Sequence, residues 1–159
     1  MKKIFFTVAF LATAFVQQSF AQDSTSQPQL SPLLHSYYDI KNALVAGDAN
    51  AAASKAEDFI KVANDINQKD VSEEARNGLL KDATHISKTK EISHQREHFA
   101  NFSTNMFALA KSVKLTSEPI YEAYCPMKKA YWLSSEKTIK NPYYGSAMLT
   151  CGSVKETLH

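Results

Sequence analysis

The feature that most constrains the fold is a helical spacing of apolar residues, repeated in four successive segments between residues 31 and 113. In the first segment, apolar residues lie three or four positions apart from Leu33 to Leu44, and Gly47 follows as a helix stop. The later segments begin near Asp48, Ser72 and Ser93. Amphipathic helices are stable when their apolar faces pack against one another. The sequence therefore predicts a mainly α fold, an antiparallel four-helix bundle.

Local signals predict where three of these helices start. Ser31 followed by Pro32 is typical of an N-cap and a first helical residue. Asp48 is placed to cap the second helix. Ser72 precedes two glutamates, which the helix dipole favours in a first turn. Short connections between the helices follow from these boundaries.

The sequence pattern changes after Thr116. Pro119 ends the helical pattern, and Asn141-Pro142-Tyr143-Tyr144-Gly145 is a strong turn signal. Short extended pieces are expected at residues 131–133 and 147–151.

A C-terminal segment this small cannot bury itself alone. Residues 119–158 are therefore expected to form a cap of short extended segments and turns on the bundle. The prediction is a single helical-bundle domain over residues 31–159 that includes this cap.

The N-terminus predicts export. Lys2 and Lys3 precede an apolar stretch, and Ser19-Phe20-Ala21 resembles a signal-peptidase site, so residues 1–21 are expected to be a cleaved signal peptide. The polar residues that follow predict a disordered leader over residues 22–30. The mature protein is then periplasmic or secreted, with no transmembrane segment after signal cleavage.

Charge argues against nucleic acid as a partner. The full chain has 18 Lys and Arg and 16 Asp and Glu, and two of the lysines belong to the signal. The mature chain therefore has 18 − 2 = 16 basic residues against 16 acidic ones. Nucleic-acid binding requires an excess of clustered positive charge.

Both cysteines lie near a methionine in the cap. Cys125 and Met127 flank Pro126, and Met148 lies three residues before Cys151. In an extended segment Cys125 and Met127 would point to one face. Thiolates and thioethers are soft ligands that select Cu(I) or Ag(I), so these four residues are candidate metal ligands.

A disulfide between Cys125 and Cys151 is the competing interpretation. Paired cysteines in an exported protein usually form a disulfide, and the residues alone favour it. It would close a loop of about 26 residues and contribute roughly 3.5 kcal/mol to stability. The two methionines would then be core fillers. A reactive thiol is a third possibility, which requires an exposed cysteine of low pKa.

The same cap residues carry a resemblance to a known family. Tyr124-Cys125-Pro126-Met127, Trp132-Leu133-Ser134, the 141–145 turn and residues 148–152 resemble the signature of the domain-of-unknown-function family numbered 3347. The resemblance extends upstream through Gln95-Arg96 and residues 99–111 to Tyr38. The chain departs from a common glycine-rich spacer at Lys128-Lys129-Ala130.

The resemblance implies a role in handling heavy metals. Members of the family occur as small exported proteins and as domains of periplasmic adaptors of copper/silver efflux pumps. It therefore makes a Cu(I) or Ag(I) site as plausible as a disulfide, and it suggests an efflux-pump adaptor as a partner. The alternative is a disulfide-stapled, non-enzymatic interaction module associated with such a system.

Other residues are weaker candidates. His94 and His98 lie four apart on the fourth helix, a spacing that can hold a metal, and His94 is kept as a further candidate ligand. His35, His85 and His159 receive no role. Aromatic residues could surround a bound cation or form the core of the cap. They are Trp132, Tyr131, Tyr143 and Tyr144.

Catalysis is not expected. A cysteine paired with His94 would lack an identifiable orienting acid and oxyanion loop. The four glycines of the chain do not cluster, so no phosphate-binding loop is present.

Overall fold

The computed structural model describes residues 30–159. The predicted signal peptide and nearly all of the predicted leader lie outside the described residues. The exception is Leu30, which was expected in the leader but is only 1% exposed and packs in the core at the start of the first helix. Among residues 30–159, no helix has both the length and the apolar character required to cross a membrane.

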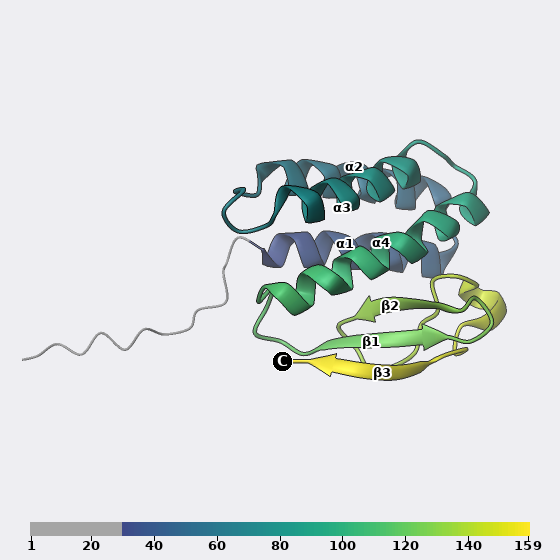
Figure 1. Ribbon diagram of the computed structural model, residues 1–159. Coiled ribbons are helices and arrows are strands. Elements are labelled where there is room, and N and C mark those ends of the chain that lie inside the picture. The colour runs from purple at the N-terminus through teal and green to yellow at the C-terminus, as the bar shows by residue number, and fades with distance from the viewer. Residues whose placement is uncertain (1–29) are drawn as a thin grey trace, which may run out of the picture.

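Four α-helices and a small three-stranded antiparallel sheet make up the described chain (Figure 1). This agrees with a mainly α fold followed by a C-terminal cap. The helices are α1 Ser31–Ala46, α2 Ala49–Asp65, α3 Glu73–Ser87 and α4 Ile92–Ser112. Consecutive helices contact one another, and α4 also packs on the sheet. Figure 1 shows the sheet on the side of α1 and α4, with α2 and α3 beyond them.

The helix boundaries follow the local signals closely. Gly47 adopts a left-handed conformation (φ 74°) and ends α1. The Asp48 side chain accepts a hydrogen bond from the Ala51 amide at 2.9 Å, and Ser72 Oγ accepts one from the Ala75 amide at 3.3 Å. Ser31 is not an N-cap, because the helix already includes it and Leu30 occupies the capping position without a side-chain bond.

The sheet has the order β2-β1-β3, with both neighbouring pairs antiparallel. Its strands are β1 Ile120–Cys125, β2 Ala130–Ser134 and β3 Ser153–Leu158. The extended piece expected at 131–133 is confirmed within β2. The piece expected at 147–151 is wrong: residues Gly145–Met148 form a short 3-10 helix, η1, and the strand begins only at Ser153. The apolar side chains of Met148 and Leu149 are exposed, so they do not mark a buried strand face.

Tyr37 joins the helices to the sheet. Its ring is fully buried and stacks on Phe99 of α4, with ring centroids 5.3 Å apart. Its hydroxyl lies 2.7 Å from Ser103 Oγ and accepts a hydrogen bond from the Leu133 amide at 3.0 Å. Because β2 is an edge strand, that amide would otherwise be buried without a partner.

A buried carboxylate lies on the same sheet. Glu122 is opposite Glu156 across β1 and β3, and Lys111 of α4 places its Nζ 2.9 Å from Glu156 Oε1. Burial raises the pKa of the Glu122 carboxyl above its ordinary value, the charge of Glu156 raises it further, and Lys111 lowers it in part. Ionisation of Glu122 is therefore less favourable in the folded protein than in the unfolded chain.

We expect Tyr37→Phe to destabilise the protein by about 1–3 kcal/mol, because it leaves the buried Leu133 amide without an acceptor. Chemical denaturation monitored by circular dichroism would measure the change in the free energy of unfolding. Tyr38→Phe is the matched control, since the Tyr38 hydroxyl forms no hydrogen bond with any residue from 30 to 159 and the ring is similarly buried. Equal effects of the two substitutions would contradict the role of the Tyr37 hydroxyl.

We expect Glu122→Gln to stabilise the protein at pH 7 by about 0.5–1 kcal/mol. A carboxyl whose pKa is raised by folding binds its proton more tightly in the folded state, so wild-type stability falls as pH rises through the raised pKa. The difference between the proteins should therefore vanish below the ordinary pKa of 4.5. Denaturation at several pH values, with exposed Glu118→Gln as the control, tests this. A difference independent of pH would contradict it.

Candidate functional site

The two cysteines meet at one end of the sheet. Cys125 is the last residue of β1, and Cys151 comes two residues before β3 begins. Since β1 and β3 are antiparallel neighbours, with Tyr124 opposite Ser153, the end of one strand lies beside the start of the other. The two Sγ atoms are 4.0 Å apart, and both cysteines are free thiols in the structure.

A tight turn holds Cys125. Residues 126–129 connect β1 to β2, and the Lys129 amide donates to the Cys125 carbonyl at 2.8 Å. The Lys128 amide donates to Cys125 Sγ at 3.4 Å. Such a bond stabilises negative charge on the sulfur. Lys129 takes a left-handed conformation (φ 57°) in this turn.

Asn141 holds the backbone around Cys151. It is fully buried, and its Nδ2 donates to the Cys151 carbonyl at 2.8 Å. Its Oδ1 accepts from the Tyr143 amide at 2.8 Å, and its own amide donates to the Leu149 carbonyl at 2.8 Å. Next to Cys151, a Cβ on Gly152 would lie 2.7 Å from Trp132, so only glycine fits there.

The Cys151 thiol resists ionisation. Burial raises the pKa of the Cys151 thiol above its ordinary value, the neighbouring Cys125 raises it further, and the Met127 backbone lowers it in part. This is the opposite of what a reactive, low-pKa thiol requires. It also means that a cation able to replace both protons would relieve the repulsion between two adjacent thiolates.

The methionines lie near the cysteines in the chain but not in the core. Met127 is 61% exposed in the turn after β1, and Met148 is 38% exposed at the end of η1. Neither is therefore the core filler that the disulfide interpretation expected. The prediction that Met127 and Cys125 share one strand face is wrong, because the strand ends at Cys125 and Met127 belongs to the turn.

The aromatic candidates divide into two groups. Trp132 and Tyr143 are buried, and their rings meet edge to face with centroids 6.1 Å apart. The Tyr143 hydroxyl donates to the Tyr131 carbonyl. Tyr144 is partly exposed, and Tyr131 is 40% exposed. Trp132 and Tyr143 thus form the core beneath the thiols.

The histidines form a separate cluster. His94 and His98 of α4 lie side by side, with their Nε2 atoms 3.2 Å apart. His85 of α3 lies beside this pair. One ring nitrogen from each of the three lies within 4.8 Å of the others. Sequence reasoning identified the His94–His98 spacing but gave His85 no role. The signal it lacked was the helical hairpin that brings the end of α3 beside the start of α4.

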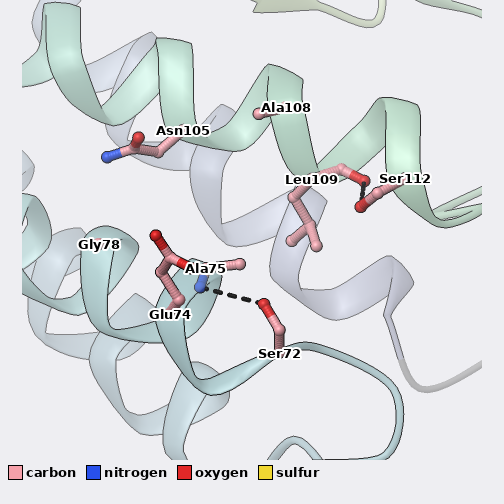
Figure 2. Close-up of a pocket in the computed structure, with 8 residues that line it drawn as sticks. All are labelled: Ser72, Glu74, Ala75, Gly78, Asn105, Ala108, Leu109 and Ser112. Carbon is pink, nitrogen blue, oxygen red and sulfur yellow. Dashed lines mark hydrogen bonds between the residues drawn. The ribbon is translucent and has the colours of Figure 1, made fainter.

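A surface pocket between α3 and α4 offers little chemistry (Figure 2). Its volume is about 260 Å³. Figure 2 shows that the Ser72 and Ser112 hydroxyls are engaged with the backbone of their own helix ends. Asn105 donates to Asp82 at 3.0 Å. The chemistry-bearing side chains of the described residues lie elsewhere, in the thiol pair and the histidine cluster.

The fold and the thiol pair describe a helical domain with a dithiol cap. Residues 33–118 match the family described as "Protein of unknown function (DUF3347)". This is slightly more than half of the 159-residue chain, and the protein belongs to that family. The matched residues begin within the first turn of α1, contain α2 to α4 and end before β1, whereas the resemblance had been carried chiefly by the cap motifs. No curated protein and no solved structure matches the chain.

We expect Asn141→Ala to destabilise the protein by about 2–4 kcal/mol, because two buried backbone groups lose their partners. The Cys151 thiol should also react faster with a thiol-specific reagent, since the backbone that positions it is released. Asn67→Ala is the control, because Asn67 makes a similar bond to the Lys69 amide at an exposed turn. Unchanged stability and thiol reactivity would show that Asn141 does not position Cys151.

Proposed function

We propose that the protein binds a soft metal ion, Cu(I) or Ag(I), through the thiolates of Cys125 and Cys151. The observation that supports this most directly is the 4.0 Å separation of the two sulfur atoms. A metal–thiolate bond is about 2.3 Å long, so two sulfurs at 120° on one ion lie roughly 4.0 Å apart. The observed separation therefore supports a shared ion bound without movement of the backbone.

The surroundings of the thiols suit a soft cation. Among the described residues, the Lys128 amide contacts Cys125 Sγ, and the rings of Trp132 and Tyr143 form the nearby core. Surroundings of this kind favour a soft monovalent ion with few ligands over a hard, hydrated ion. Met127 and Met148 adjoin the two cysteines on exposed, unbranched side chains. They are proposed to complete the coordination by rotating their thioethers inward.

The proposed setting is the cell envelope. It rests on the signal-like N-terminus and on the resemblance to adaptor-associated domains, and it makes a copper/silver efflux adaptor the proposed partner. The proposed role is to carry or sense the ion, with no catalytic step. Cys125 is buried and Cys151 half-buried, so transfer to another protein is proposed to run through the exposed thioethers of Met127 and Met148.

The alternative is a disulfide-stapled interaction module. The same sulfur separation supports it, because small side-chain rotations would bring the atoms to the bonding distance of about 2.05 Å. Exposed methionines on such a module would then belong to a docking surface. The two functions differ in whether reduced protein takes up metal.

The test is an anaerobic Cu(I) titration of the reduced protein against a chromophoric Cu(I) chelator, together with thiol counting before and after reduction. We expect one Cu(I) per chain, and we expect Cys125→Ser and Cys151→Ser each to abolish uptake. Met127→Leu and Met148→Leu should each weaken binding by about tenfold, by loss of one ligand.

Met106→Leu is the matched control, because Met106 is fully buried in α4 and should leave Cu(I) uptake unchanged. Protein that has no free thiols when isolated and takes up no Cu(I) after reduction would favour the disulfide module and overturn the metal proposal. Uptake that survives both serine substitutions would overturn the assignment of the ligands.

A further inference from the structure

The three clustered histidines are brought together by a helical hairpin. His85 lies in the last turn of α3, while His94 and His98 lie in the first two turns of α4. Only four residues, 88–91, separate the helices. The imidazoles therefore converge at the closed end of the hairpin, some of them exposed to solvent.

This hairpin is held from inside by a buried glutamine. Gln95 is fully buried, and its Nε2 donates to the Thr89 carbonyl at 2.8 Å and the Ala49 carbonyl at 2.9 Å. It also lies 3.3 Å from the Ile86 carbonyl. One amide thus ties the turn, the end of α3 and the start of α2 to α4, so the backbones that carry the histidines are fixed relative to one another.

The distances between the ring nitrogens fit a coordination sphere. With Zn–N bonds of about 2.0 Å, two ligands of a tetrahedral ion lie roughly 3.3 Å apart. The His94 and His98 Nε2 atoms are 3.2 Å apart. His85 stacks on His98 with ring centroids 4.3 Å apart, and one of its nitrogens lies within 4.8 Å of the other two. A rotation of the exposed His85 side chain would point that nitrogen at the same ion.

Carboxylates flank the cluster. Glu97 Oε2 lies 4.0 Å from His94 Nδ1, the ring nitrogen that does not face His98. A carboxylate at that nitrogen orients a histidine ligand and strengthens it. The Asp82 carboxyl lies close enough to His85 and His98 to interact with them electrostatically, although burial raises its pKa.

The surroundings of His98 favour its neutral ring. Burial lowers the pKa of His98 below its ordinary value, His85 and His94 lower it further, and Asp82 and Glu97 raise it in part. Neutral imidazole is the form that binds metal. A simple hydrogen bond between His94 and His98 would account for that pair, but it gives no reason for the third ring.

We propose that His85, His94 and His98 form a second metal site, which takes a divalent ion of the class that prefers imidazole ligands, such as Zn²⁺, with water in the fourth position. This class differs from the soft monovalent ion proposed for the thiols. The site shares no residue with the thiol pair, so it does not depend on the proposed function.

The experiment is a Zn²⁺ titration of the full chain carrying Cys125→Ser and Cys151→Ser, which prevents sulfur from contributing. Competition with a chromophoric chelator measures affinity and stoichiometry, and thermal denaturation with and without Zn²⁺ provides a second measurement. We expect one Zn²⁺ per chain and a higher melting temperature with Zn²⁺, because the ion would link α3 to α4.

Each of His85→Gln, His94→Gln and His98→Gln should weaken binding by about tenfold or more and remove the thermal shift. His35→Gln, on the exposed face of α1, is the control and should change neither measurement. The His85 variant is decisive: a pair on α4 alone would bind equally well without His85, and that result would overturn the three-histidine site. If the chain carrying only Cys125→Ser and Cys151→Ser bound no Zn²⁺, that result would overturn the site as well.

Discussion

The attachment of the cap depends on one hydroxyl group, that of Tyr37. It lies at the point where α1, α4 and the edge of the sheet meet. It forms hydrogen bonds with both the Ser103 hydroxyl and the Leu133 amide. Without it, the edge strand would bury an unsatisfied amide against an apolar helix surface. Because β2 pairs with β1, and β1 with β3, this contact also determines where the two cysteines lie relative to the helices.

Sequence reasoning succeeded where structure is determined locally. The predicted helix end at Gly47 and the predicted caps at Asp48 and Ser72 are all confirmed. Each involves only residues within four positions along the chain. The strand expected at 147–151 failed, because alternation and apolar content do not distinguish an exposed 3-10 turn from a short strand. The observed strand, β3, contains several polar residues, and it is stabilised by pairing with β1.

The candidate sites show the same division. That Cys125 and Cys151 would meet was expected from their number and from the predicted export of the protein, but the 4.0 Å separation comes from strand pairing across 26 residues. For the histidine cluster, the sequence indicated the His94–His98 spacing but not the third residue, His85. The contribution of His85 depends on the angle and length of a hairpin, and no spacing rule within one helix contains that information.

The position of the thiols at the junction of two neighbouring strands has an evolutionary consequence. Cys125 ends β1 and Cys151 precedes β3, so their separation in space is set by the ladder between those strands. The intervening segment of β2, turn and η1 could lengthen or shorten in related proteins while the sulfurs stay together, provided that Asn141 still anchors the return. Relatives should therefore keep the two short cysteine motifs while the number of residues between them drifts.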